Sequence, residues 1–208
     1  MDKVLVLAPH TDDGELGCGA TVANLLTKGA IVKYCAFSIA EDSVPSGLAS
    51  DILDTECRRA TARLGLSSED VEILRFPVRN FPAFRQDILD KLISLRSSFS
   101  PSLVFCPSSN DVHQDHKVIY EETLRAFKRS SILGYEFMWN NFTINSTFFS
   151  VVTKEDLDTK VAALSMYESQ SHRIYTQSDI IRSQANLRGL QVMEEFAEAF
   201  EVIRWVTR

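Results

Sequence analysis

The chain has 208 residues, which is enough for one α/β domain with a sizeable apolar core. Its residues are 45% hydrophobic and 24% charged, the composition of an ordinary soluble globular protein. The formal net charge of -6 gives a nucleic-acid partner no electrostatic support, so we expect no such partner.

The first residues, MDKV, run directly into an apolar segment. They lack the basic head, the longer apolar run and the small-residue cleavage site of a signal peptide. We also expect no membrane span, because no apolar stretch approaches the required length. The four cysteines are scattered without a C-x-x-C pair, which predicts neither disulfides nor a thiolate zinc site. Together these features predict a cytoplasmic protein.

Apolar segments and helical periodicities alternate along roughly the first 130 residues. The strands predicted there are residues 3–8, 30–38, 71–76 and 102–106, and the helices that follow them are 16–26, 48–66, 84–99 and 115–128. Further strands are predicted at 134–137, 147–152 and 199–206, with helices at 155–168 and 179–192. This alternation predicts a single α/β domain over residues 1–208, with a mostly parallel sheet between two layers of helices.

Two polar segments follow the first and the fourth predicted strands. They read PHTDDGE (residues 9–15) and NDVHQDH (residues 110–116). In a doubly wound sheet with strand order 3-2-1-4-5, these two strands are neighbours, and ligands bind in the crevice between their carboxyl ends. We therefore expect the two segments to face each other.

Three of the four histidines of the chain fall in these segments, beside at least three carboxylates. This set suits a zinc ion held by two histidines and one carboxylate, with a fourth position left for water. In a simpler interpretation, Asp12 and Asp13 only cap a helix, and His113 and His116 lie on the surface of another helix. Either segment alone would favour that interpretation. The presence of both at adjacent strand ends favours a metal site.

At this point the sequence resembles a known family. The run HTDDGE (residues 10–15) resembles the A-H-P-D-D-E signature of the PIG-L/LmbE family of N-acetylglucosaminyl de-N-acetylases, and HQDH (residues 113–116) resembles its H-x-D-H motif. Weaker matches at Glu56, at Ser169-Gln170 and at residues 197–200 extend the resemblance over nearly the whole chain. The resemblance implies a Rossmann-like (LmbE-like) three-layer fold.

The resemblance also implies a role for each residue of the two motifs. His10, Asp13 and His116 would bind Zn²⁺, Asp12 would act as the general base, and His113 would stabilise the oxyanion or protonate the leaving amine, with Asp115 holding its ring. Zinc lowers the pKa of its water toward about 7 and polarises an acetyl carbonyl. The expected reaction is hydrolysis of an N-acetylated amino sugar to acetate and a free amine, and the family makes a homo-oligomer plausible.

Three departures from the family pattern bear on the site. Thr11 replaces the usual proline, and Gly14 is inserted between the second aspartate and the glutamate. Leu53 stands where the family often has an arginine, so a substrate contact made from that helix is either absent or supplied from elsewhere.

The loop of residues 77–86, after the third predicted strand, is a candidate for binding substrate. Its two arginines, Arg79 and Arg85, match the oxygens of a phosphate, which predicts a sugar that carries phosphate, as in a sugar nucleotide. The loop could equally bind sugar hydroxyls. Alternatively, it is a solvated loop leading into a helix, and one or both arginines pair with nearby acids such as Asp87 or Asp90 and never contact substrate.

Further along the chain, Asn140 is a candidate amide donor to a sugar. Trp139 beside it offers a ring on which a sugar could stack, although the sequence predicts packing of this ring in the core at least as strongly. His172 lies outside the two motifs, and a lone histidine in a polar stretch is more often structural. Alternatively, residues 171–173 line the mouth of the pocket.

The substrate class remains open between a free sugar, a sugar nucleotide and a glycoconjugate. One alternative keeps the metal and changes the substrate to an amino-acid or thiol conjugate. Another is a sugar-binding module without turnover, which the presence of both Asp12 and His113 argues against, since a binder needs neither.

Overall fold

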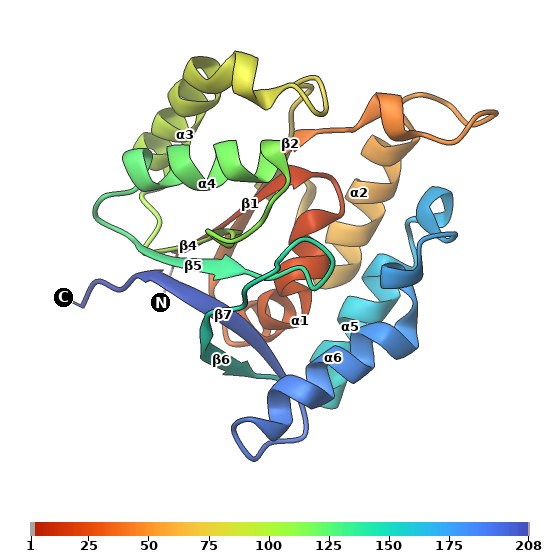
Figure 1. The fold of residues 1–208 in the computed structure, drawn as a ribbon, viewed down its shortest axis with the longest axis vertical. Helices are drawn as coiled ribbons and strands as arrows, with labels where there is room; N and C mark the ends of the chain where they lie inside the picture. The colour runs from red at the N-terminus through yellow and green to blue at the C-terminus, as the bar shows by residue number, and fades with distance from the viewer. Residues whose placement is uncertain (1–2, 208) are drawn as a thin grey trace.

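The computed structural model describes residues 3–207, whose strands form one sheet with helices on both faces (Figure 1). The strands are β1 (Lys3–His10), β2 (Ile31–Ser38), β3 (Val71–Ile73), β4 (Leu103–Pro107), β5 (Ser131–Tyr135), β6 (Ser146–Val151) and β7 (Ala197–Arg204). The helices are α1 (Asp13–Thr27), α2 (Ile52–Leu64), α3 (Arg85–Phe99), α4 (Gln114–Ala126), α5 (Lys154–Leu164) and α6 (Ser178–Leu190). The predicted α/β fold class is confirmed.

The strand order is β3-β2-β1-β4-β5-β7-β6. The first five strands in this order are parallel, as the alternation of strands and helices predicted. β7 pairs antiparallel with both β5 and β6, which extends the sheet beyond the predicted order 3-2-1-4-5. β1 therefore lies between β2 and β4, and the crevice where the strand order reverses opens between β1 and β4.

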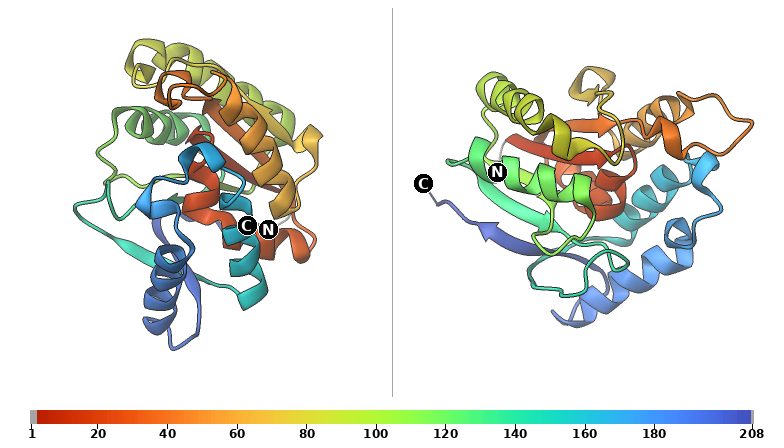
Figure 2. Two further views of the ribbon diagram at one scale, coloured as in Figure 1. Left: turned by 90° about the vertical axis from the view of Figure 1, so that its right-hand side faces the viewer. Right: turned by 45° about the horizontal axis from the view of Figure 1, so that its top comes forward.

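The two faces of the sheet carry separate layers of helices (Figure 2). On β1, Val4 and Val6 pack toward α1, α2 and α5, while Leu5 and Leu7 pack toward α3 and α4. All four side chains are fully buried, which explains why this strand is a continuous apolar run rather than an alternating one. Among residues 3–207, no helix is both long and apolar enough to cross a bilayer.

Helix α1 begins at Asp13, three residues before the predicted start, and is kinked. The kink lies at Cys18, where φ is -145° and ψ is 18°. The carboxylate of Glu198 on β7 accepts a hydrogen bond from the backbone N of Thr21 at 2.7 Å, and Lys160 on α5 donates to the carbonyl of Leu16 at 2.6 Å. Backbone groups that the kink removes from the helix are thus bonded by neighbouring elements.

Gly14 lies where α1 packs against Tyr34 of β2. Its backbone N donates to the hydroxyl of Tyr34 at 3.2 Å, and a Cβ on Gly14 would lie 2.4 Å from Cε2 of that ring. Tyr34 is buried, and its hydroxyl donates to the carbonyl of Thr11 at 2.9 Å. The ring cannot move without disturbing the turn after β1. The glycine inserted into the motif is therefore a packing requirement.

We predict that Gly14→Ala lowers the free energy of unfolding by about 1–3 kcal/mol, because the added methyl group overlaps a buried ring. Gly19→Ala, in the same helix, is the matched control. Its Cβ would lie 3.1 Å from Cγ of Lys160, a contact that a shift of a few tenths of an ångström relieves, so we expect a change within about 1 kcal/mol. Urea unfolding of the two variants measures the difference. Equal stabilities would contradict the packing argument.

Candidate functional site

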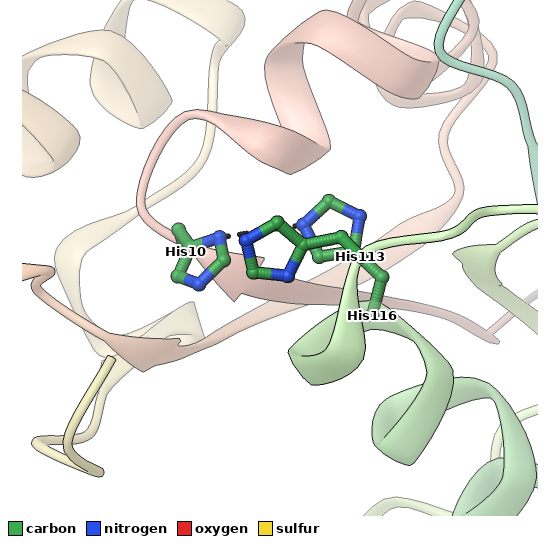
Figure 3. Close-up of side chains that lie close together, drawn as sticks. All are labelled: His10, His113 and His116. Atoms are coloured by element: carbon green, nitrogen blue, oxygen red, sulfur yellow. Dashed lines mark hydrogen bonds between the residues drawn. The ribbon is translucent and has the colours of Figure 1, made fainter. Parts of the chain in front are cut away.

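The segments that follow β1 and β4 meet at the carboxyl ends of these neighbouring strands. β1 ends at His10, and α4 begins after His113, which occupies its N-cap position. The rings of His10, His113 and His116 gather at this point (Figure 3), and one ligand atom from each lies within 4.8 Å of the others. This cluster could hold a metal ion.

A tighter set of three donor atoms includes Asp13. Nδ1 of His10 lies 3.1 Å from Oδ2 of Asp13, which in turn lies 3.2 Å from Nε2 of His116. The two ring nitrogens are 3.3 Å apart. Ligand atoms around a tetrahedral zinc are separated by about 3.3 Å, given bonds of about 2.0–2.1 Å. The three atoms therefore form a triangle of the size that one metal ion requires.

Two further carboxylates hold the outer nitrogens of these histidines. Oδ2 of Asp115 lies 3.0 Å from Nε2 of His10, and Oδ2 of Asp111 lies 2.7 Å from Nδ1 of His116. Each carboxylate favours a proton on the nitrogen that it contacts, which leaves the inner nitrogen free to bind a metal. The carboxylate of Asp115 thus contacts the ring of His10, not the ring of His113 as the family resemblance implied.

The donor set attracts positive charge. Burial opposes a charge on His116, but Asp13 and the hydrogen bond with Asp111 outweigh it and raise the pKa of His116 to about 10. The pKa of His10 is also raised, since Asp13 and Asp115 outweigh the effect of burial. The two histidines in turn hold the pKa of Asp13 low, although burial alone would raise it. A cation, either a proton or a metal ion, is therefore stabilised between the three groups.

His113 is less well oriented to be the third ligand. Its ring is stacked on that of His116, with 4.5 Å between centroids and an angle of 27° between planes. The lone pairs of nitrogen lie in the ring plane, so two nearly parallel rings do not converge on one ion. Nδ1 of His113 also accepts a hydrogen bond from the backbone N of Asp115 at 3.2 Å. This bond caps α4 and places the proton of a neutral ring on Nε2.

Asp12 lies at the N-cap position of α1, but its side chain makes no capping hydrogen bond. Burial and the neighbouring charge of Asp13 raise the pKa of Asp12 to about 6. For His113, burial and the two other histidines lower the pKa to about 4. The site therefore offers a carboxylate that accepts a proton near neutral pH and an imidazole that is neutral there.

These groups line a cavity of about 250 Å³. Arg79 and Asn140, both predicted to bind substrate, lie on its wall, and so does Leu53. Arg85 does not line the cavity. Its guanidinium group instead pairs with Glu122, through Nε at 2.9 Å, and with Glu121 at 2.7 Å.

Trp139 also lines the cavity, and its ring contacts two other aromatic rings. It stacks on Phe137 with 5.0 Å between centroids and on Tyr175 with 4.2 Å. Trp139 remains 41% exposed, and its two ring contacts join two loops of the cavity wall.

Two residues of the site were not assigned a role from the sequence. Asp111 lies within the second motif, but only the fold shows that it contacts His116. Arg173 lines the cavity from a loop that the sequence indicated only as a possible pocket mouth. The buried carboxylate of Glu56 anchors this loop by accepting hydrogen bonds from the backbone N and the hydroxyl of Ser169, at 2.9 and 2.6 Å. Two of the weaker motif matches are thus in contact.

The chain resembles known proteins in both its sequence and its fold. The chain is 26% identical over 172 residues to the uncharacterized deacetylase YaiS of Escherichia coli (strain K12), which covers 80% of this chain and 90% of that protein. The fold resembles the N,N'-diacetylchitobiose deacetylase of Pyrococcus horikoshii, with a TM-score of 0.82 and 20% identity over 97% of this chain and 84% of that one.

It also resembles a 4-carboxy-2-hydroxymuconate hydratase, GalB from Pseudomonas putida KT2440. The TM-score is 0.79 and the identity 18%, over 100% of this chain and 99% of that one. At these identities the structural likenesses show the fold alone, and one fold carries two reaction types.

The profile of the PIG-L family, described as GlcNAc-PI de-N-acetylase, matches residues 5–127. The match spans more than half of the chain and contains both polar segments of the site. The chain belongs to the PIG-L family.

Proposed function

We propose that this protein is a zinc-dependent hydrolase that removes the acetyl group from an N-acetylated amino sugar, whether free, nucleotide-linked or part of a glycoconjugate. One observation carries the proposal. Three donor atoms, one each from His10, Asp13 and His116, lie 3.1–3.3 Å apart. The side chains of Asp12 and His113 line the same cavity and are not needed as ligands. Family membership supports deacetylation as the reaction.

The donor set fits a divalent transition metal. Two imidazole nitrogens and one carboxylate oxygen are ligands that zinc binds readily, and iron or cobalt are chemically acceptable substitutes. When bound, the ion supplies a Lewis acid that polarises the acetamide carbonyl and makes water more acidic. Asp111 and Asp115 keep the two imidazoles oriented for this purpose.

Asp12 is the proposed general base. Its carboxylate makes no capping hydrogen bond, and burial together with the charge of Asp13 raises its pKa to about 6. It takes a proton from the water whose oxygen forms a bond to the carbonyl carbon. It then returns this proton to the amine nitrogen as the C–N bond breaks, which gives acetic acid and a neutral amine. The acid then loses its remaining proton to the amine or to solvent, so that acetate is released.

His113 is the proposed oxyanion donor. Because Nδ1 accepts the capping bond from Asp115, a neutral ring carries its proton on Nε2, which is free to donate to the carbonyl oxygen as negative charge develops there. Protonation of Nδ1 would break the cap. The hydrogen bonding therefore favours the oxyanion role over proton delivery to the leaving amine.

The proposal predicts acetate release from a panel of N-acetyl amino sugars, lost on metal removal and restored by zinc. Coupled acetate detection measures the release, and elemental analysis measures the metal. N-acetyl amino acids and N-acetylated thiol conjugates belong in the same panel, because turnover of these alone would identify a different deacylase. Undiminished activity of rigorously metal-free protein would exclude the zinc mechanism.

Substitution of Asp12 and of Asp13 should have different effects, because one is the proposed base and the other a proposed metal ligand. We expect Asp12→Asn to retain the metal and to lower kcat by about 10²–10⁴-fold, the usual contribution of general-base catalysis. Asp13→Asn should lose most of the bound metal, since it removes one of three ligands. Metal content and kcat of each purified variant give the answer. The reverse pattern would show that the two roles are exchanged.

A further inference from the structure

Two guanidinium groups reach the cavity from different loops. Arg79 follows β3 and Arg173 follows α5, and both line the cavity that contains the metal-ligand set. Among residues 3–207, no carboxylate lies within 4.0 Å of either group, whereas Arg85 is paired with two glutamates. The cavity therefore presents two arginine side chains without an ion-pair partner.

The guanidinium group of Arg173 is held by Tyr175, but one of its N–H donors has no acceptor among residues 3–207. Its Nη1 donates to the hydroxyl of Tyr175 at 2.5 Å, and the guanidinium carbon lies 5.7 Å from the centroid of that ring. Tyr175 is itself stacked on Trp139. The Nε of Arg173 is buried and has no hydrogen-bond partner in the described part of the chain. A buried donor without an acceptor is costly, which favours a ligand that brings an acceptor to this position.

Arg79 is held through its backbone. Its φ of 64° is unusual for a residue other than glycine, and the strained turn persists because Asp115 accepts hydrogen bonds from the backbone N of Arg79 and of Phe81, at 2.6 and 3.1 Å. The same carboxylate holds His10. The position of Arg79 is thus tied to that of the metal-ligand candidate His10, while its side chain is exposed and has no ion-pair partner among residues 3–207.

We propose that Arg79 and Arg173 together bind an anionic group, a phosphate or a carboxylate, on the acetylated amino sugar. Two guanidinium groups match the oxygens of an oxyanion with charge-assisted hydrogen bonds, and neutral hydroxyls offer no such charge. Arg173 replaces Arg85 in the pair that the sequence suggested. This inference rests on the proposed function and specifies its substrate class.

A rival role exists for Arg173, because its charge is near enough to act on Asp12. In that role it would support the general base and would lower kcat equally for every substrate when removed. An anion-binding role instead acts on KM and only for charged substrates. The two roles are therefore separable by kinetics.

The test uses the zinc-loaded full-length protein and four substrates: N-acetylglucosamine, its 1-phosphate, its 6-phosphate, and N-acetylmuramic acid as the carboxylate. We expect at least one anionic substrate to exceed N-acetylglucosamine in kcat/KM by about 10-fold or more. Arg79→Gln and Arg173→Gln should each reduce that kcat/KM by about 10- to 100-fold, mostly through KM, and should reduce the kcat/KM of the neutral sugar by a clearly smaller factor.

Arg173→Lys, which keeps the charge without the fork, should retain part of the preference and guards against misfolding of the glutamine variant. Arg58→Gln is the matched control, since Arg58 is exposed on α2 and pairs with Asp54. It should leave the preference unchanged. The 1-phosphate, 6-phosphate and carboxylate arms identify which anion is bound.

Equal turnover of neutral and anionic sugars would overturn the inference and leave the proposed deacetylation intact. So would an Arg173→Gln variant that lowers kcat uniformly with KM unchanged. Absence of acetate release from every sugar would instead contradict the proposed function, and the inference with it.

Discussion

The site depends on two carboxylates that orient two histidine rings so that one nitrogen of each ring faces the other ring. Asp115 contacts the outer nitrogen of His10, and Asp111 contacts the outer nitrogen of His116. The inner nitrogens then lie 3.1–3.3 Å from one another and from Oδ2 of Asp13. Such an arrangement is repulsive unless positive charge lies between the groups. The hydrogen bonding of the protein thereby creates a position for a cation.

Asp115 connects this arrangement to the rest of the fold. It lies on α4 after β4, its side chain holds the histidine at the end of β1, and it accepts two backbone hydrogen bonds from the loop after β3. One buried carboxylate therefore joins three loops at the carboxyl edge of the sheet. This edge is where a doubly wound fold binds its ligands. The chain leaves β1 for the layer of helices on one face and leaves β4 for the layer on the other face, so a crevice forms between the two connections. The geometry of the donor set and the position of Arg79 follow from the same contact.

Much of this could be predicted from the sequence, because it depends on regular patterns. The alternation of apolar segments and helical periodicities predicted the parallel strands and their order, and this order brought the two histidine-rich segments together. The antiparallel pairing of β7 was not predicted, because single strands late in the chain carry no signal of their direction. The early start of α1 was missed because Asp13, Gly14 and Glu15 are not apolar, although all three are buried.

Contacts between distant side chains were harder to predict. Asp115 was assigned to its sequence neighbour His113, but the rotamers of the folded chain bring it to His10. The sequence suggested that Arg85 could form an ion pair with an acid a few residues away, but the two glutamates that it contacts lie on α4. Arg173 lies in an irregular loop whose place at the cavity depends on the contact between Ser169 and Glu56. Motif spacing contains no information about such contacts.

The most direct test of the cation position is a crystal structure of the zinc-loaded protein, with diffraction data collected on both sides of the zinc absorption edge. We expect a single anomalous peak that marks one zinc ion. This ion should lie about 2.0–2.2 Å from Nδ1 of His10, Oδ2 of Asp13 and Nε2 of His116. His113 should remain unbound, with its Nδ1 still accepting the bond from the start of α4. An ion bound by His113 in place of Asp13, or located elsewhere in the molecule, would contradict the assignment.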